Sequence, residues 1–202
     1  MIPNATALLA LTSKPKIDEI NLRLLQEFYA QYLNPKTYTY TLADENVIIL
    51  KFEEDKFCHL VGVEQSVRGS VSPNVLNSYK GKNGWNRIKN EEITFAHLKA
   101  TGGKAKFGDI KIKLVYFYLL PHILSSPNKV VYYNVVVNHI NCEILIYDIQ
   151  QNAYIHLGIE KGSDGIYFPR TFLIEKITAS SSGTKFIVPQ PEPVNVIKTV
   201  IS

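Results

Sequence analysis

The most informative part of the sequence is Phe57-Cys58-His59-Leu60-Val61-Gly62. It is an apolar run that closes on a glycine and contains one imidazole. The apolar segment 47–52 precedes it and has the composition of a β-strand, so we expect a rigid element to hold the histidine. Because few other side chains both take up and release a proton near neutral pH, His59 is the first candidate for a catalytic residue. The alternative is a hydrogen-bonded core histidine, since most buried polar groups are simply satisfied.

Length and hydropathy limit the class of protein. The chain has 202 residues, which suits one domain with additions or two small domains. No run reaches the roughly 18 apolar residues of a membrane helix. The apolar segment 5–11 is short and follows no basic residue, so we do not interpret it as a signal peptide.

The two cysteines, Cys58 and Cys142, both lie in apolar contexts. We expect buried free thiols, which favour a reducing, cytoplasmic location. Neither these cysteines nor the five scattered histidines have metal-ligand spacing. The chain also lacks an ATP-binding loop, a dinucleotide fingerprint and a nucleophile elbow, so no cofactor is predicted.

Positive charge is concentrated in the middle of the chain. Nine basic and three acidic residues lie between Tyr79 and Lys113, whereas the whole chain has a net charge of +4. Clustered cations attract polyanions, and interleaved aromatic rings can stack on bases. The alternative is a solvated lysine-rich face. The predicted nucleic-acid-binding residues are Lys80, Lys82, Trp85, Arg87, Lys89, Lys104 and Lys106.

The first two thirds of the chain favour helices around one β-hairpin. Apolar spacing predicts a helix over 16–33, ended by Asn34-Pro35. Strands are expected at 37–42 and 46–53. Further helices are expected from Ser72-Pro73 to before Gly81, at 91–100, and at 109–124, where sixteen residues are long for a strand.

The last third is rich in β-formers. Four runs at 129–137, 142–149, 152–159 and 166–176 are separated by short breaks, which predicts an antiparallel meander. Residues 179–202 are expected to form an exposed tail, in which 186–188 could add an edge strand. The class is α+β, with helices packed on a four-stranded antiparallel sheet preceded by an N-terminal helix and a β-hairpin. The expected divisions are 1–36, 37–178 and 179–202.

Strand alternation distributes the polar residues of the meander. Tyr154 and His156 share one face of their strand, toward a cleft or solvent, while the opposite apolar face should pack under the helices. In the next strand Tyr167 and Thr171 share one face. Arg170 points to the other face unless a bulge near the preceding proline brings it beside Thr171.

Residues 57–62 together with the late stretch Tyr167-Phe168-Pro169-Arg170-Thr171-Phe172 resemble the phage-associated branch of the barnase, EndoU, colicin and RelE-like (BECR) nucleases. The resemblance covers roughly residues 37–176. It implies helices on a four-stranded antiparallel sheet, and RNA cleavage without a metal by a toxin or phage–host conflict protein. The family's motif carries over to His59, Gly62, Arg170 and Thr171.

Such cleavage needs a base for the ribose 2′-hydroxyl, an acid for the leaving 5′-oxygen and a cation for the phosphate, and it yields a 2′,3′-cyclic phosphate. His59 and His156 are the candidates for proton transfer, and Arg170 for the phosphate clamp. Thr171 could donate a hydrogen bond to the phosphate, and Tyr154 or Tyr167 could stack on a base or assist proton transfer. The weaker candidates are His97, His122 and His139.

Two non-catalytic alternatives remain open at this point. The chain could be a nucleic-acid-binding module that keeps the fold without activity, or an inhibitor or interaction protein with a merely solvated lysine face. The expected partners are RNA, with tRNA as one candidate, and a neutralising protein.

Overall fold

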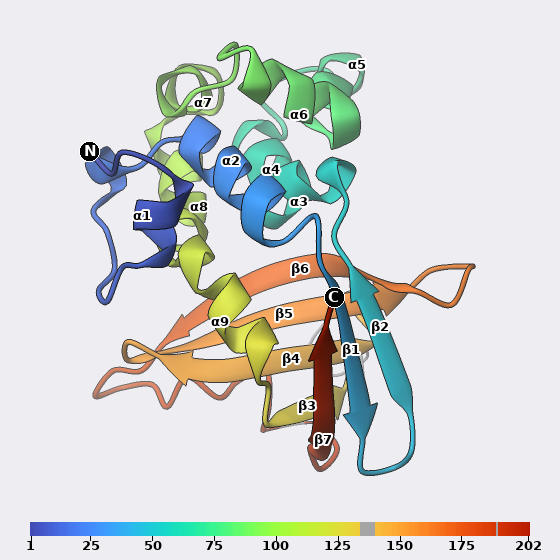
Figure 1. The fold of residues 1–202 in the computed structure, drawn as a ribbon. Helices are drawn as coiled ribbons and strands as arrows, with labels where there is room; N and C mark the ends of the chain where they lie inside the picture. Colours follow the sequence, from blue (N-terminus) through green and yellow to red (C-terminus); the bar gives the residue numbers. More distant parts are fainter. Residues whose placement is uncertain (134–139, 189) are drawn as a thin grey trace. The chain divides into compact units, whose positions relative to one another are not determined.

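The computed structural model describes residues 1–133, 140–188 and 190–202. The chain forms two compact units (Figure 1). The helical unit comprises residues 1–35 and 53–118, and the barrel unit comprises residues 36–52 and 119–202.

The helical unit contains every described α-helix except the last. Its α-helices are α1 (Ala5–Leu9), α2 (Leu22–Tyr32), α3 (Phe57–Leu60), α4 (Val63–Val67), α5 (Pro73–Leu76), α6 (Gly81–Lys89), α7 (Phe95–Gly102) and α8 (Lys104–Tyr116). Short 3-10 turns lie at η1 (Ile17–Glu19), η2 (Glu54–Lys56) and η3 (Asn77–Tyr79), and η4 (Phe117–Leu119) continues α8.

One predicted helix start is confirmed, and two predicted helices have bounds that differ from those expected. Ser72 caps α5, whose first residue is Pro73. The helix predicted over 16–33 is divided, because Asn21 caps α2 by accepting a hydrogen bond from the Leu24 N–H at 2.7 Å. The helix predicted over 109–124 is present, but it begins at Lys104 and continues through η4 into α9 (Leu120–Ser125).

Aromatic rings form the centre of the helical unit. Phe57 packs edge to face on Tyr29, Trp85 and Phe117, with ring centroids 5.3, 5.5 and 5.8 Å apart. The first residue of the 57–62 stretch is therefore a core residue that joins α3 to α2 and α6.

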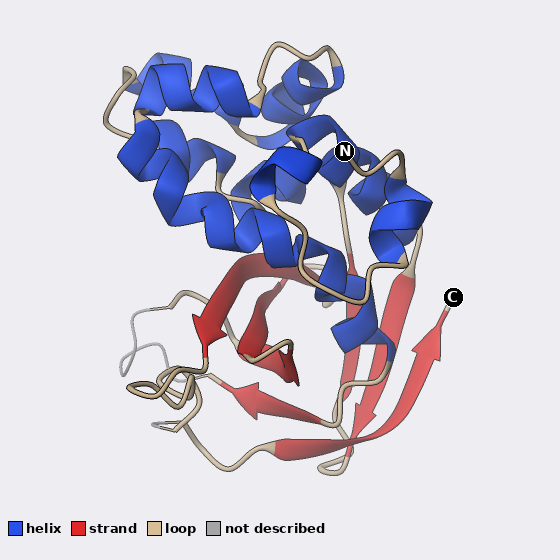
Figure 2. Cartoon of the chain, turned by 90° about the vertical axis from the view of Figure 1, so that its left-hand side faces the viewer, coloured by secondary structure: helices blue, strands red, loops and turns tan. Residues whose placement is uncertain are grey.

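The strands of the barrel unit close into a barrel, seen as a ring in Figure 2. They are β1 (Thr37–Leu42), β2 (Val47–Lys51), β3 (Lys129–Tyr132), β4 (Ile144–Gln150), β5 (Ala153–Lys161), β6 (Tyr167–Lys176) and β7 (Val194–Ile201). Their order around the barrel is β1-β2-β6-β5-β4-β3-β7.

The prediction of helices on a four-stranded antiparallel sheet is wrong. The meander β3–β6 is present, but β1 and β2 are joined to it, so the seven described strands form one mixed barrel. β2 pairs in parallel with β6 through Leu50 and Tyr167, and β7 pairs with both β1 and β3. The part of the chain expected to be a tail therefore closes the barrel. Residues 186–188 form no strand.

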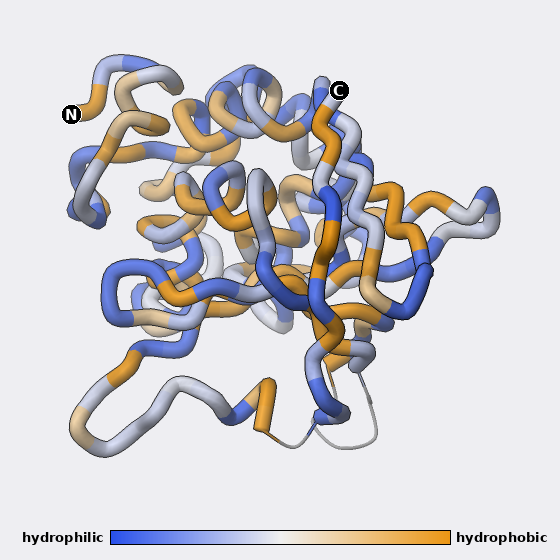
Figure 3. The backbone as a smooth tube through the Cα atoms, turned by 60° about the horizontal axis from the view of Figure 1, so that its bottom comes forward, coloured by the Kyte–Doolittle hydropathy of each residue, from blue (hydrophilic) through white to orange (hydrophobic). Residues whose placement is uncertain are grey.

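The interior of the barrel is the main core of this unit. Ile155, Leu157 and Phe172 are fully buried there, and the Tyr40 hydroxyl donates to the Leu124 carbonyl of α9 at 2.8 Å. The apolar face of β5 thus lines the barrel interior. Figure 3 shows both apolar and polar stretches along β7, the strand that ends at the C-terminus.

A second apolar cluster covers part of the outer face of the barrel. Val131, Cys142 and Leu145 are buried in it, and Tyr147 and Phe186 pack against it. Residues 134–137 of the predicted first strand, and the weaker candidate His139, lie outside the described residues. Within the described ranges, no helix is both long and apolar enough to cross a membrane.

Candidate active site

The 57–62 stretch is helical and places His59 at the surface. Phe57 and Leu60 are fully buried in α3, whereas the side chain of His59 is 47% exposed. Helical spacing explains this arrangement, because residues 57, 60 and 61 face the core and residue 59 faces outward. The alternative of a core histidine is therefore wrong for His59.

Gly62 turns the chain sharply from α3 into α4. Its φ is +83°, a left-handed conformation that favours glycine. A Cβ atom at this position would lie 2.6 Å from Cγ2 of Ile110 in α8. The glycine thus permits both the turn and the close approach of α8.

The turn brings a carboxylate and a guanidinium to the imidazole. His59 Nδ1 lies 3.3 Å from Glu64 Oε1, and Arg68 Nη2 donates to the same oxygen at 2.7 Å. Glu64 has a side chain only 10% exposed, whereas that of Arg68 is 62% exposed. We call these three residues the His59 cluster.

The electrostatics of the His59 cluster fix the tautomer of the imidazole. The hydrogen bond from His59 lowers the pKa of Glu64 against the opposing effect of burial, and the charges of Lys80 and Arg68 lower it further. Glu64 is therefore ionised at neutral pH and can only accept. His59 donates from Nδ1–H, which leaves the lone pair of Nε2 to take up a proton.

Sequence reasoning did not identify Glu64 and Arg68. The available signal was their spacing of four residues, at which oppositely charged side chains meet on a helix. Two predicted nucleic-acid-binding residues lie near them. Lys80 acts on the charge of Glu64, and Lys106 Nζ donates to the Arg68 carbonyl at 2.6 Å.

The other predicted nucleic-acid-binding residues differ in exposure. Lys82, Lys89 and Lys104 are exposed. Arg87 forms an ion pair with Glu92 at 2.9 Å. Trp85 is only 5% exposed and packs in the aromatic core, so its ring offers no face on which a base could stack.

His156 is fully buried, contrary to the expectation of a cleft or solvent-facing position. Phe186, from the segment before β7, packs edge to face on its ring at 5.6 Å. His156 Nε2 lies 3.2 Å from Glu175 Oε2. Burial lowers the pKa of His156 to about 4, so the imidazole is neutral at neutral pH.

A β-bulge lies at Arg170. Gly158 of β5 pairs with Thr171, but the next residue, Ile159, pairs with Pro169. The extra residue is therefore Arg170, whose Nε lies 3.2 Å from Glu160 Oε2. A bulge places consecutive side chains on one face, as the sequence allowed for Arg170 and Thr171.

The predicted catalytic residues are divided between the units. His59 belongs to the helical unit, whereas His156, Arg170, Thr171, Tyr154 and Tyr167 belong to the barrel unit. Tyr154 stacks on His156 with ring centroids 5.9 Å apart. Tyr167 lies at the junction of β2 and β6, with Lys161 Nζ 5.7 Å from its ring centroid.

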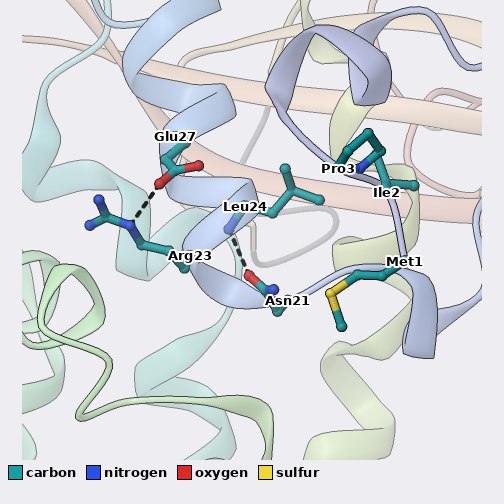
Figure 4. A pocket seen from close by; sticks show the side chains of 7 residues that line it. All are labelled: Met1, Ile2, Pro3, Asn21, Arg23, Leu24 and Glu27. Atoms are coloured by element: carbon teal, nitrogen blue, oxygen red, sulfur yellow. Dashed lines mark hydrogen bonds and ion pairs between the residues drawn. The ribbon is translucent and has the colours of Figure 1, made fainter.

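A hollow of about 200 Å³ in the helical unit contains none of the predicted site residues (Figure 4). Its polar side chains bond to the protein itself, since Arg23 forms an ion pair with Glu27 at 2.8 Å and Asn21 caps α2. Among the described residues, no group of three His, Cys, Asp or Glu side chains is placed to hold a metal ion.

Comparison with family models identifies a family for the chain. A family model described as phage-Barnase-EndoU-ColicinE5/D-RelE like nuclease4 matches residues 22–193. No curated protein and no solved structure matches the chain significantly.

Proposed function

We propose that this protein is an endoribonuclease that works without a metal and uses His59 for proton transfer. The chain belongs to the phage-Barnase-EndoU-ColicinE5/D-RelE like nuclease4 family, and the proposal builds on that membership. The family membership confirms the resemblance carried by residues 57–62 and 167–172. It supports a nuclease, and the RNA substrate and the mechanism are our proposal.

The observation that carries the proposal is the half-exposed imidazole of His59 on the ionised carboxylate of Glu64. The lone pair of Nε2 takes the proton of a ribose 2′-hydroxyl, and the 2′-oxygen attacks phosphorus. The bond from phosphorus to the 5′-oxygen breaks, and this oxygen takes a proton from solvent. The products are a 2′,3′-cyclic phosphate and a 5′-hydroxyl.

Arg68 is suited to hold the phosphate. A guanidinium has five N–H donors, and the bond to Glu64 Oε1 uses only one of them. Its charge stabilises the phosphate as negative charge develops on the oxygens. The roles predicted for Arg170, Thr171, Tyr154 and Tyr167, which belong to the barrel unit, remain predictions.

The test uses the full chain with a folded tRNA in EDTA. We expect cleavage to products ending in a 2′,3′-cyclic phosphate, and His59→Ala to lower the rate by about 10²–10⁴, as for the loss of a general base. His122→Ala is the matched control, because His122 is an exposed histidine in α9. Undiminished cleavage by His59→Ala, or no RNA cleavage by the unchanged protein, would overturn the proposal.

The phage association in the family's description supports a role in conflict between phage and host. Expression in a bacterium should then arrest growth, and His59→Ala should relieve the arrest. If both proteins arrest growth equally while RNA stays intact, a non-catalytic binding role is favoured instead.

A further inference from the structure

We propose that two copies of the chain form a dimer by pairing the open edges of their β2 strands. This inference goes beyond the proposed function and does not depend on it. Strand β2 is paired with β1 over all five of its residues. On its other side, the described residues give it a single pairing, that of Leu50 with Tyr167 of β6. Residues 47–49 therefore present an open strand edge on this side of the barrel.

The backbone groups at this edge point away from β1. In an antiparallel pair, the N–H and C=O groups of every second residue face the partner strand. The Leu42 N–H donates to the Asn46 carbonyl at 2.9 Å, so the groups of residues 46, 48 and 50 face β1. Those of Val47 and Ile49 consequently face outward. Outward-facing groups on a strand edge are a template for pairing with another strand.

The side chains at the edge are apolar and exposed. Val47 is 54% exposed and Ile49 is 38% exposed, whereas Ile48 and Leu50 are buried. Proteins protect an open edge with a proline, a bulge or a charged side chain, and residues 47–50 contain none of these. Pairing with a further strand would cover both exposed side chains and engage the outward backbone groups.

The edge is complementary to a second copy of itself. Two β2 strands related by a twofold axis run antiparallel, and an axis beside Ile48 places Val47 opposite Ile49 of the second copy. Each Ile49 N–H can then donate to the Val47 carbonyl of the other copy. The same register brings Lys51 of each copy to Glu45 of the other.

The two charged residues favour this occupant and this register. Glu45 and Lys51 are both exposed, and they lie on either side of the apolar residues of the edge. Two opposite-charge pairs would therefore flank the apolar centre of the dimer. A register shifted by two residues loses these pairs, because the oppositely charged residues then no longer meet.

The test measures the mass of the full chain by analytical ultracentrifugation over a range of concentrations. We expect a monomer–dimer equilibrium in the micromolar range, because the pairing is shorter than a standard interface. Glu45→Lys and Lys51→Glu should each weaken dimerisation by about tenfold, since each variant brings like charges together at two places. The double variant with both changes should restore dimerisation. No RNA is present, so the result does not bear on the nuclease proposal.

A proline variant tests the backbone pairing. Ile49→Pro removes an N–H group that faces outward and leaves the groups that face β1, so a strand edge tolerates it. Dimerisation should weaken by about tenfold or more, because a donor to the second copy is lost. Hydrogen exchange should show that β1 remains protected in this variant. Ile49→Thr keeps the N–H group and the branched side chain, and should weaken the dimer less.

Lys129→Glu is the matched control for Lys51→Glu. Lys129 is an exposed lysine of β3, a strand that pairs with β4 on one side and β7 on the other. This variant should dimerise like the unchanged chain. A chain that stays monomeric leaves the edge to a strand of another protein and overturns the proposal. A dimer that neither charge variant weakens, or that the double variant does not restore, forms through another surface and overturns it as well.

Discussion

At the scale of single residues, Glu64 is a positioning residue that acts through His59. Its carboxylate holds the imidazole by Nδ1–H and stabilises the cation that forms when Nε2 takes a proton. Glu64→Gln keeps the shape but removes the charge, so we expect the cleavage rate to fall by roughly 10- to 100-fold. Glu64→Asp keeps the carboxylate, so it should retain more of the cleavage rate than Glu64→Gln.

Glu27→Gln is the control for this experiment, since Glu27 also pairs with an arginine on a helix of the same unit. It should not change the cleavage rate. If Glu64→Asp is as slow as Glu64→Gln, the charge of Glu64 does not act through His59, and Glu64 only supports the fold.

His156 makes the stability of the barrel unit depend on pH. Its pKa is about 4 in the folded chain, against an ordinary value of 6.5, because burial disfavours the charged ring. Between these values the unfolded chain binds a proton that the folded chain does not. Folding stability should therefore fall as pH decreases from 6.5 to 4, by up to about 3 kcal/mol from this residue.

Denaturant unfolding of the unchanged chain and of His156→Gln at several pH values measures the contribution of His156 to the free energy of unfolding. Burial raises the pKa of Glu175, which stabilises the folded chain as pH falls and so partly offsets the effect. The difference between the two proteins isolates His156. If the free energy of unfolding of both proteins falls by the same amount between pH 7 and pH 4, His156 takes up its proton while buried, and the prediction is wrong.

At the scale of elements, the turn between α3 and α4 requires Gly62. Gly62→Ala places a β-carbon in the left-handed region and 2.6 Å from Ile110 Cγ2. We expect the free energy of unfolding to decrease by about 1–2 kcal/mol from backbone strain, and further from the clash. Trp85, the single tryptophan, is buried in the helical unit, so its fluorescence follows the loss of this unit.

Two other glycines separate these causes. Gly69 also has a positive φ, of +75°, but a Cβ there meets only Lys106 Nζ, at an ordinary contact distance of 3.7 Å, so Gly69→Ala reports backbone strain without a clash. Gly108 lies within α8, where a Cβ meets nothing within 4 Å, and Gly108→Ala should stabilise by about 0.5–1 kcal/mol. If Gly62→Ala costs no more than Gly69→Ala, the packing of α8 on the turn is unimportant.

Local signals in the sequence predicted where helices and strands lie better than which strands pair with each other. Strand β1 and the cap of α5 at Ser72 follow from alternation and capping, which need only neighbouring residues. The barrel depends on pairings such as Tyr38 with Ile201, which periodicity does not specify. The prolines that precede β7 favoured a tail, although the strand starts only after them.

In the candidate site, too, local sequence patterns do not reveal contacts between residues that are distant in the sequence. Strand alternation placed Tyr154 and His156 on one face, and the stacked rings agree with this. The burial of His156 depends on Phe186, thirty residues later, and no local pattern reveals such a contact. The spacing of four residues would have paired Glu64 with Arg68 on a helix. The sequence was not interpreted in this way, because residues 57–62 follow a strand and were not expected to begin a helical segment.

At the scale of the whole molecule, neither unit is one continuous piece of chain. The barrel unit takes β1 and β2 from residues 36–52 and its other strands from residues 119–202. The helical unit likewise takes α2 from before β1 and its other large helices from after β2. The family match over 22–193 covers most of both units but ends just before β7.

This arrangement predicts that a fragment 37–178, the nuclease domain expected from the sequence, does not form the barrel. It lacks β7, so β1 and β3 lose the strand that pairs with both of them. Unpaired strand edges leave backbone groups without partners and invite aggregation. The fragment 37–202 keeps all seven described strands and should recover the amide protection of the barrel in hydrogen exchange. If 37–178 shows the same protection in β1 and β3 as 37–202, closure by β7 is dispensable and the shorter domain boundary is correct.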